Sequence, residues 1–416
     1  MKTTRVEKHV IHQSHAYYSM LDDYCFKSKN LYNHATYLIK KELTSNGKWL
    51  RYEDLDRLLK VPGCDFDYRS MPGAVSAQQT LRSVDDVWKA YFRAHKDWKK
   101  HPHKYLGEPR FPKYKHKSKG RHVVRLTNQV CSLDLTGNVI RFPKVFNGLE
   151  VKCQFTQKDD YVKFLQTRIV PKGNHIVIEL IYEIEVQDAL LDSNRCLGID
   201  LGVDNLAAVS NNVGLPFYLI DGKSIKSINR YWNKLNSNDQ SALTKSKKKQ
   251  CTSARTARRN YKRTQKINDY LHKASRWIVN FAKDNNIDTI VIGKNDLWKQ
   301  QANMGKCNNQ KFVQIPHARF INMMQYKGEE CGIKIVCIDE SYTSKTSFLD
   351  NEVPAKQEKY AGTRTKRGLF KTSNGTLINA DSNAALQILK KYNNNLFADF
   401  DYTRILLQRP IKLNVS

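Results

Sequence analysis

Two aspartates stand at points in the sequence where buried secondary structure would hold a metal ion. Asp200 lies in RCLGIDLGVDNLAAVS (residues 195–210), which predicts a buried strand, a tight turn and an antiparallel second strand. Asp381 lies in TLINADSNAALQILKK (residues 376–391), at the start of an expected helix. A carboxylate inside a buried strand is costly unless a cation or hydrogen bonds compensate its charge. The pair therefore predicts a divalent metal site, against the alternatives of a satisfied strand-end aspartate and a helix N-cap.

Small residues surround both aspartates and would let the elements that carry them pack closely on a neighbour. Gly198 and Gly202 leave room around Asp200. The expected helix has small residues on both sides of Asp381, namely Ala380, Ser382, Ala384 and Ala385. If that helix packs on the Asp200 strand, the two carboxylates meet. A first strand and a last helix that each carry an aspartate are typical of an RNase H-like nuclease core.

Charge and cysteine content narrow the class of protein. The chain has 416 residues and a formal net charge of +30, with 70 Lys and Arg against 40 Asp and Glu, which predicts a polyanionic partner such as nucleic acid. Nine cysteines stand singly, which argues against a zinc ribbon and favours a reducing compartment. Cys153, Cys196 and Cys337 lie in apolar runs and are expected in the core. No apolar run of about 18 residues and no signal peptide is found, so a membrane partner is not expected.

The N-terminal half combines helices, an extended basic segment and short strands. Apolar periodicity predicts helices over much of residues 14–100, after a short strand at 2–13. Residues 101–121 combine three prolines, several aromatic residues and many cations, which favours phosphate contacts with aromatic stacking over a solvated linker. From 123 to 185, strand signals separated by Gly-Asn turns predict a small antiparallel barrel or sheet, which the N-terminal strand can join.

A second basic run, residues 245–263, lies in a region (223–283) that is expected to be mainly helical. No acidic residue interrupts the run, so nucleic-acid binding is favoured over a solvated face. The residues assigned to nucleic acid are Arg110, Lys113, Lys115, Lys117, Arg121, Arg255, Arg258, Arg259, Lys262 and Lys299.

Several segments together resemble one family. Three segments resemble the RuvC-like nuclease of TnpB (OrfB) proteins: GIDLGVDNLAAV (198–209), the buried strand DTIVIG (288–293) and NADSNAALQILKK (379–391). TnpB proteins are encoded by insertion sequences and are related to type V CRISPR effectors. Upstream, SKNLYN (28–33), the long helix ending VWKAYFRAHKDW and GEPRFPKYK (107–115) are similar to that family's N-terminal half. The resemblance thus covers nearly the whole chain.

The sequence departs from the family pattern in two places. TnpB proteins typically carry a second catalytic glutamate at the end of the strand matching DTIVIG, where this chain has Gly293-Lys294-Asn295. Many also carry a four-cysteine zinc motif before the last aspartate, whereas residues 341–380 contain no cysteine. Yet four segments resemble a TnpB branch in which this glutamate is relocated: GKNDLWKQ, NNQKFVQIPH, ESYTSKTSFLD and RGLF. The eukaryotic Fanzor relatives share this arrangement. The relocated residue would here be Glu340.

Strand geometry permits that relocation. In an RNase H-like sheet, the strand at 333–338 lies beside 288–293 and two strands away from Asp200, a separation of about 9–10 Å. Metal ions about 4 Å apart, between an aspartate and a longer glutamate, can bridge much of that gap. Asp339 should point to the opposite face and Asp296 lies in a loop, so both are weaker candidates. Glu340 as a plain surface residue is the remaining alternative.

The resemblance implies an α+β multidomain fold, with an RNase H-like (RuvC) α/β core, a small β-barrel (wedge) domain and a helical recognition module. The expected boundaries are 1–13 for the first barrel strand, 14–120 for the recognition module with its basic segment, 121–190 for the barrel, 195–392 for the nuclease core with a helical basic insertion at 223–283 and a zinc-free loop at 341–376, and 393–416 for a C-terminal tail.

The resemblance also implies an activity. The family members are RNA-guided DNA endonucleases that cut target DNA next to a short flanking motif. Asp200, Glu340 and Asp381 would hold two Mg²⁺ ions, and no zinc is expected. The implied partners are an omega-type guide RNA and target double-stranded DNA. The protein would be a monomer that binds one RNA. It would act in the cytoplasm or nucleoid of a prokaryote, or in the nucleus of a eukaryotic host. Two alternatives stay open: a nuclease-dead RNA-guided repressor derived from TnpB, and a guide-independent, structure-selective nuclease.

Overall fold

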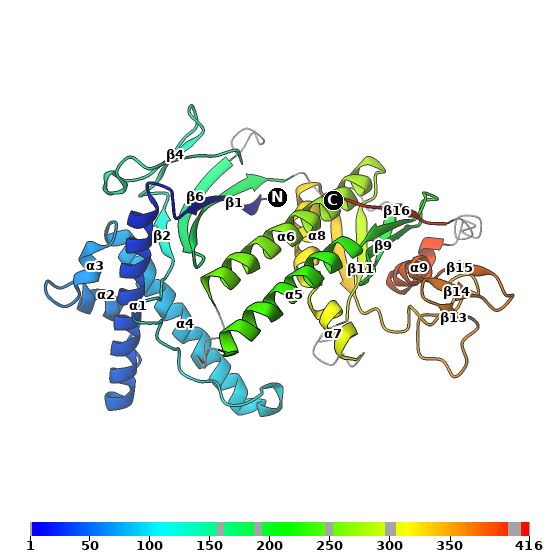
Figure 1. The fold of residues 1–416 in the computed structure, drawn as a ribbon, viewed down its shortest axis with the longest axis horizontal. Helices are drawn as coiled ribbons and strands as arrows, with labels where there is room; N and C mark the ends of the chain where they lie inside the picture. Colours follow the sequence, from blue (N-terminus) through cyan, green and yellow to red (C-terminus); the bar gives the residue numbers. More distant parts are fainter. Residues whose placement is uncertain are drawn as a thin grey trace. The chain divides into compact units, whose positions relative to one another are not determined.

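The computed structural model describes residues 2–155, 162–186, 194–245, 253–295, 305–397 and 409–415 (Figure 1). They divide into two compact units, Lys2–Glu185 and the chain from Val186 onward, and each unit is described by itself. Within these residues no helix is both long enough and apolar enough to cross a membrane.

Helices α1 to α4 build one side of the N-terminal unit. They span Tyr18–Asn46, Tyr52–Leu59, Phe66–Ser70 and Ala74–Lys100. α1 ends at Gly47, whose φ of 65° is a left-handed conformation that glycine adopts without a Cβ penalty. α4 packs its apolar face, including the fully buried Leu81, Val84 and Trp88, into the core of this unit. The helices predicted from apolar periodicity therefore form.

Two antiparallel sheets complete this unit. One has the order β1-β7-β6-β2, formed by Lys2–His12, His175–Glu185, Val162–Pro171 and Val124–Thr127. The other is β3-β4-β5, formed by Ser132–Asp134, Val139–Arg141 and Glu150–Lys152. Asn138 and Gly173 have positive φ in the β3–β4 and β6–β7 turns, as the Gly-Asn signals predicted. The strands lie in two separate sheets in the described residues, so a closed wedge barrel stays a prediction.

The second unit is built on a six-stranded sheet with the order β12-β11-β8-β9-β10-β16. Its strands are Lys334–Ile338, Thr289–Gly293, Cys196–Leu201, Asn205–Asn211, Tyr218–Asp221 and Ile411–Leu413. β8, β9 and β10 form an antiparallel meander, while β11 pairs parallel with β8 and β12 parallel with β11. The first five strands have the order and directions of an RNase H-like core, which fits the expected RuvC-like fold.

Helices cover both faces of this sheet. Leu197 and Ile199 of β8 lie in one apolar cluster with residues of α6 (Ala254–Asp284) and α8 (His317–Glu330). Side chains alternate along a strand, so Gly198 and Asp200 point to the opposite face, where α9 (Ala380–Tyr392) packs. A Cβ on Gly198 would lie only 2.3 Å from the carbonyl oxygen of Ala385 in α9. The condition set by the sequence is therefore met: α9 packs closely on the strand that carries Asp200, and Gly198 permits the close approach.

Four local features differ from the sequence-based expectation. The expected tail contains β16, which pairs parallel with β10. The expected loop 341–376 contains β13 (Thr363–Lys366) and β14 (Leu369–Lys371), which form a small sheet with β15 (Leu377–Asn379). The polar stretch 295–310, whose composition is typical of a loop, includes the start of α7 (Lys306–Val313). Cys337 is exposed, because β12 is the edge strand of its sheet, so its expected core position was wrong.

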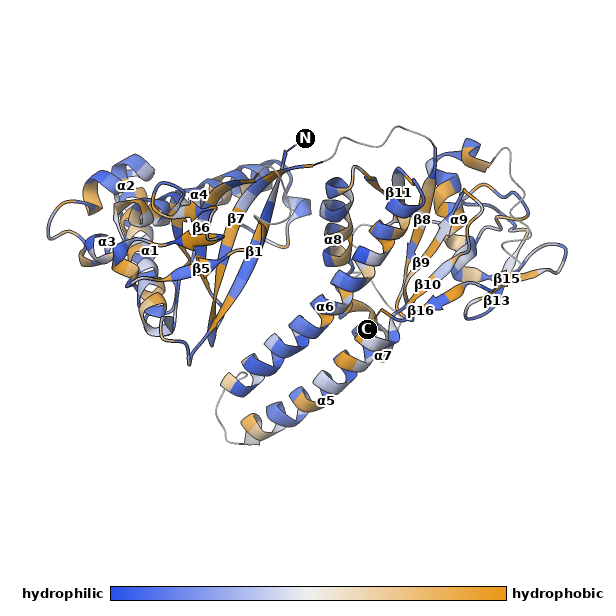
Figure 2. Cartoon of the chain, turned by 90° about the horizontal axis from the view of Figure 1, so that it is seen from above, coloured by the Kyte–Doolittle hydropathy of each residue, from blue (hydrophilic) through white to orange (hydrophobic). Residues whose placement is uncertain are grey.

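Helices α5 (Lys223–Lys245) and α6 are long and follow β10 in the second unit. The strands of the sheet are largely hydrophobic, whereas the N-terminal part of α6 is largely hydrophilic (Figure 2). The buried residues of α6 begin with Thr256 but concentrate after Ile267, which is the part that packs on the sheet. The N-terminal part of α6 thus presents most of its polar residues to solvent or to α5.

Candidate active site

Asp200 lies near the end of β8, on the face of the sheet that α9 covers. Burial raises the pKa of its carboxyl well above the ordinary value, and the carboxylates of Glu340 and Asp381 raise it further, while the Arg364 guanidinium lowers it. These interactions mean that Glu340 and Asp381 are both close to Asp200. Three acidic groups thus converge at one edge of the sheet, and their mutual repulsion calls for a cation.

Asp381 lies in the first turn of α9 but does not cap it. The cap is Asn379, whose side-chain oxygen accepts hydrogen bonds from the backbone N–H groups of Asp381 and Ser382 at 3.1 and 2.9 Å. The Asp381 carboxylate is therefore not used as the N-cap, and accepts hydrogen bonds from Asn205 Nδ2 at 2.7 Å and from Arg364 at 3.0 Å. Its position at the helix N-terminus also favours a negative charge.

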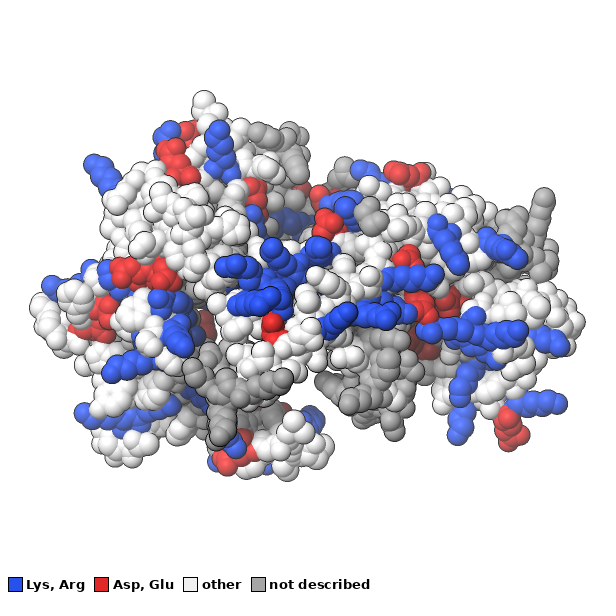
Figure 3. All heavy atoms as spheres, in the orientation of Figure 1, with Lys and Arg blue, Asp and Glu red and all other residues white. Residues whose placement is uncertain are grey.

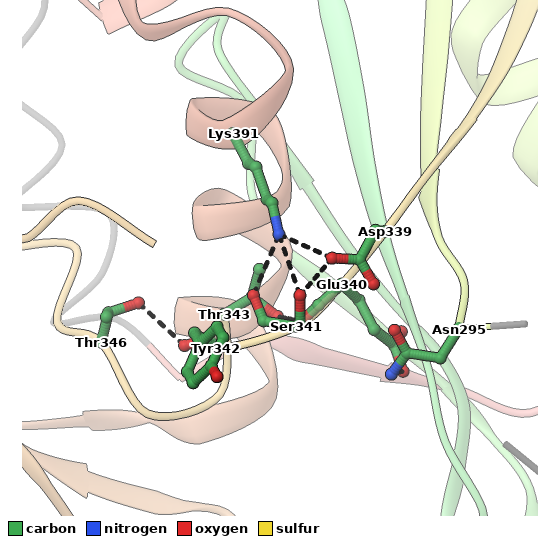
Figure 4. A network of polar contacts seen from close by, with 8 residues as sticks. All are labelled: Asn295, Asp339, Glu340, Ser341, Tyr342, Thr343, Thr346 and Lys391. Atoms are coloured by element: carbon green, nitrogen blue, oxygen red, sulfur yellow. Dashed lines mark hydrogen bonds and ion pairs between the residues drawn. The ribbon is translucent and has the colours of Figure 1, made fainter. Parts of the chain in front are cut away.

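Glu340 follows β12 by two residues and turns back over β11 (Figure 4). Gly293, the last residue of β11, makes room for it: a Cβ there would lie 3.0 Å from Glu340 Oε2 and 2.5 Å from Cδ1 of Ile388. Asn295 donates a hydrogen bond to Glu340 Oε1 at 3.1 Å. Burial raises the pKa of Glu340 to about 7, with a smaller contribution from Asp339. Its other oxygen, Oε2, is buried and has no hydrogen-bond partner within the described residues.

The two rival carboxylates are placed differently. Asp339 is exposed and forms an ion pair at 3.0 Å with Lys391, in the last turn of α9, and a hydrogen bond with Ser341 (Figure 4). These contacts depress the pKa of Asp339. The side chain of Asp339 is thus held at the opposite end of α9 from Asp381. Asp296 lies outside the described residues.

The three carboxylates are close but do not yet enclose an ion. No three His, Cys, Asp or Glu side chains within the described ranges are arranged as a ready metal-binding group. Asp381 is instead held by Arg364, a half-exposed cation on β13. The donor set nevertheless suits a hard divalent cation, because it consists of carboxylate oxygens and no described residue forms a hydrogen bond with Glu340 Oε2.

Arg364 reaches the site because the segment between Glu340 and α9 is held by buried polar contacts. Glu352, which is 9% exposed, accepts hydrogen bonds from the backbone N–H groups of Ser347 and Ala361 at 2.6 and 2.7 Å. Along α9, three buried polar side chains bond to this segment: Asn383 to Thr346 and Phe348, Gln387 to Glu352, and Lys390 to Asn351. These contacts fix the segment that precedes β13.

The basic segment before β2 lies along α1 in the N-terminal unit. Asn33 exchanges two hydrogen bonds with the backbone of Lys115, and Lys29 donates to the Lys117 carbonyl at 2.6 Å. Arg110, Lys113 and Lys117 are exposed. By contrast, Lys115 is half-buried with its ammonium over the Tyr32 ring, and Arg121 forms a bidentate ion pair with Asp22. Three of these five cations are therefore available to a phosphate backbone.

A similar division holds on α6. Arg255, Arg258 and Lys262 are exposed, at spacings of three and four residues that place them on one face. Arg259 instead faces α5, where it pairs with Asp239 and donates to the Leu235 carbonyl. Figure 3 shows Lys and Arg side chains gathered over the α5–α6 hairpin. Lys299 lies outside the described residues.

Sequence reasoning missed Arg364, Asn205 and Asn295, which all contact the candidate carboxylates. The basic character of the segment 341–376 was visible, but no spacing singled out which of its cations returns to Asp381. Asn205 lies at the tight turn expected after Asp200, so its sequence position indicates a turn residue. Asn295 stands where the family's glutamate is missing, and its sequence position gives no further signal.

Comparison with known protein families gives two matches. Residues 179–299 match the model of OrfB_IS605, described as a probable transposase. Residues 317–388 match a model described as Cas12f1-like, TNB domain. The two matched ranges together contain all three candidate carboxylates, Asp200 in the first and Glu340 and Asp381 in the second. Both ranges fall within the second unit, apart from residues 179–185.

Two curated proteins are similar to the chain. The CRISPR-associated endodeoxyribonuclease Cas12f2 of Micrarchaeota archaeon (strain CG1_02_47_40) is 28% identical over 233 residues, covering 52% of this chain and 40% of that protein. The CRISPR-associated endodeoxyribonuclease Cas12f1 of Sulfoacidibacillus thermotolerans is 26% identical over 229 residues, covering 52% of this chain and 50% of that protein. The matched part therefore spans half or less of each relative's length.

Two solved structures give weaker similarity over most of the chain. The cryo-EM structure of a Cas12f1-sgRNA-target DNA complex has a TM-score of 0.35 at 14% identity, covering 94% of this chain and 100% of that chain. The crystal structure of an AacC2c1-sgRNA-extended non-target DNA ternary complex has a TM-score of 0.41 at 10% identity, covering 88% of this chain and 64% of that chain.

Proposed function

We propose that this chain, which is a TnpB-like relative of the type V CRISPR effectors, is an RNA-guided DNA endonuclease that cuts target DNA beside a short flanking motif. The observation that carries the proposal is the meeting of Asp200, Glu340 and Asp381 at one edge of an RNase H-like sheet. The curated relatives are named as endodeoxyribonucleases, which supports the same class of reaction.

Gly293 supports the assignment of Glu340 as the third catalytic carboxylate. The space that a side chain at position 293 would fill is occupied by the Glu340 carboxylate, so the two positions exclude each other. A glutamate that moved from the end of β11 to the segment after β12 would keep its carboxylate in the same region of the site. The missing glutamate at 293–295 therefore does not require a dead nuclease.

Two Mg²⁺ ions would be held by Asp200, Glu340 and Asp381. Two features make this site suitable for Mg²⁺: its donors are carboxylate oxygens, and Glu340 Oε2 has no hydrogen-bond partner within the described residues. When bound, the ions lower the pKa of an attacking water and stabilise the leaving 3′-oxygen. Asn205 and Asn295 hold one oxygen each of Asp381 and Glu340. Arg364, which donates to Asp381, can pair with a phosphate oxygen of the DNA instead, because a guanidinium binds either anion.

An omega-type guide RNA and target double-stranded DNA are the proposed partners, with one RNA bound per monomer. Base pairing between guide and target would carry sequence specificity, while the protein holds the backbone of the heteroduplex. The exposed cations Arg110, Lys113 and Lys117, and those of α6, supply phosphate contacts in this proposal. The formal net charge of +30 supports a polyanionic partner. The domain boundaries and the cellular location stated above stay predictions.

One alternative is favoured by a specific observation. The described residues contain no ready group of three metal ligands, and position 293 lacks the usual glutamate, as in a nuclease-dead repressor that binds DNA through its guide. Such a protein would still bind guide and target. It would not cleave the target with Mg²⁺ present.

The test begins with purified protein and the RNA that accompanies it. We expect sequencing of this RNA to give one species, and a reprogrammed guide to direct cleavage of a plasmid that carries the matching sequence. Cleavage with absent or heterogeneous RNA would show a guide-independent nuclease. Guide-directed binding of the plasmid without cleavage would show the repressor.

A further inference from the structure

Two asparagine amides hold two of the three carboxylates, Asp381 and Glu340, in the same way. Asn205 Nδ2 donates to Oδ2 of Asp381 at 2.7 Å, and Asn295 Nδ2 donates to Oε1 of Glu340 at 3.1 Å. Each amide therefore fixes one oxygen of its carboxylate. We propose that Asn205 and Asn295 are positioning residues, which orient Asp381 and Glu340 for a divalent cation; this inference rests on the proposed function.

The chemistry of the amide suits this role better than a charged donor would. A neutral N–H restricts the rotation of the carboxylate but leaves its full negative charge for a cation. A lysine or arginine in the same place would neutralise that charge and compete with the ion. Arg364 does pair with Asp381, but through Oδ1, the oxygen that Asn205 does not use. Glu340 shows the result most clearly, because Asn295 holds its Oε1 while its buried Oε2 has no hydrogen-bond partner in the described part of the chain.

The backbone around Asn205 is fixed tightly enough to make its amide a defined support. Gly202 lies so close to Asn205 that a Cβ at position 202 would be 2.6 Å from the Asn205 carbonyl oxygen. His317 Nε2 donates to the Gly202 carbonyl at 3.0 Å, which ties this turn to α8. Asp204, which directly precedes Asn205, forms ion pairs with Lys226 and Arg367. The turn that presents Asn205 is thus held from three elements.

Asn295 is placed by the strand that carries Gly293. It follows β11 by two residues, and Lys294 between them donates its backbone N–H to the Ile338 carbonyl of β12 at 2.8 Å. This bond continues the pairing of β11 with β12 beyond the last strand residue. The Asn295 side chain therefore lies beside the Glu340 carboxylate (Figure 4). The relocation of the glutamate and the presence of an amide at 295 fit each other, because the amide now supports the carboxylate that this position lacks.

The expected effect is on metal affinity. Removing a hydrogen bond that orients a metal ligand typically weakens metal binding by about 10–100-fold. Asn205→Ala and Asn295→Ala should each raise the dissociation constant for Mn²⁺ by about that factor. The matched control is Asn211→Ala, because Asn211 is buried in β9 and its side-chain amide bonds to the backbone of Val213 and Leu215, away from the carboxylates. It should lower the melting temperature without changing the affinity for Mn²⁺.

Mn²⁺ binding is measured by electron paramagnetic resonance on the full chain with its RNA, and Asp200→Ala supplies the background from other sites. Loss of Mn²⁺ affinity in both asparagine variants, with Asn211→Ala at the wild-type value, supports the inference. Unchanged affinity in both variants, while Asp200→Ala abolishes specific binding, overturns the inference and leaves the proposed function standing. Wild type without specific Mn²⁺ binding overturns both. If one asparagine variant does not fold, the other decides the outcome.

Discussion

Neutralising the exposed face of α6 should reduce the salt dependence of nucleic-acid binding by an amount that the structure sets. Arg255, Arg258 and Lys262 are exposed on one face. Their replacement by Gln removes three cations that we propose contact phosphates. Each lost contact lowers the slope of log affinity against log salt by about 0.7 for a single strand or about 0.9 for duplex DNA. The slope should therefore fall by about 2.1 for single-stranded RNA and by about 2.7 for duplex DNA.

This change is large enough to measure by filter binding. Over a fourfold rise in salt, from about 50 to 200 mM, the triple variant should lose about 20-fold less affinity for single-stranded RNA than wild type does. Arg259→Gln is the matched control, since it removes the same charge from the same helix. Its guanidinium already pairs with Asp239 of α5, so its slope should stay at the wild-type value. An unchanged slope in the triple variant, or a fall of about 0.7 per removed charge in the control as well, would refute this use of α6.

Three further predictions follow from packing, protonation and metal content. Gly198→Ala should destabilise the protein by about 1–3 kcal/mol in urea unfolding, because the added Cβ meets the backbone of Ala385; a neutral result would mean that α9 does not press on β8 as described. The pKa of Glu340 is raised to about 7, above its ordinary value of 4.5, so the protonated carboxyl stabilises the metal-free protein fully below about pH 4.5. The free energy of unfolding should fall by about 3 kcal/mol as the pH rises from there through 7. Glu340→Gln should remove this pH dependence, and an identical pH profile of unfolding in both proteins would contradict the prediction. The segment 341–376 contains no cysteine and is held by Glu352 and α9, so elemental analysis should find no stoichiometric zinc, and one tightly held zinc per chain would contradict that expectation.

The parts of the fold that sequence predicted are those with a local chemical signal. The sequence around Asp200 predicted the strand β8, and the small residues of the last helix indicated that α9 could pack closely on a neighbour. The structure identifies this neighbour as β8, and Gly198 shows why the contact is close. Gly-Asn pairs located two hairpins because few residues accept positive φ. No local signal points to Glu340, and its proposed role comes from the resemblance to TnpB alone.

The parts that sequence did not predict depend on contacts between distant segments. Asn205 and Asp381 are separated by 176 positions, and nothing near either residue indicates their hydrogen bond. The burial of Lys115 and the pairing of Arg121 with Asp22 follow from how the basic segment lies on α1, which composition cannot reveal. β16 pairs through only three residues, too few for a periodic pattern to distinguish a strand from a tail.

The most direct test of the central claim is guide-directed cleavage by Glu340→Gln with saturating Mg²⁺. This substitution keeps the volume and polarity of the side chain but removes the charge that would compensate the cations. We predict that it abolishes cleavage while guide-RNA binding stays at the wild-type level, as Asp200→Ala and Asp381→Ala also should. Asp339→Asn is the matched control, because that neighbouring carboxylate is held by Lys391 away from the site, and it should retain most activity. Wild-type cleavage by Glu340→Gln would contradict the account, and loss of cleavage in Asp339→Asn alone would place the third carboxylate elsewhere.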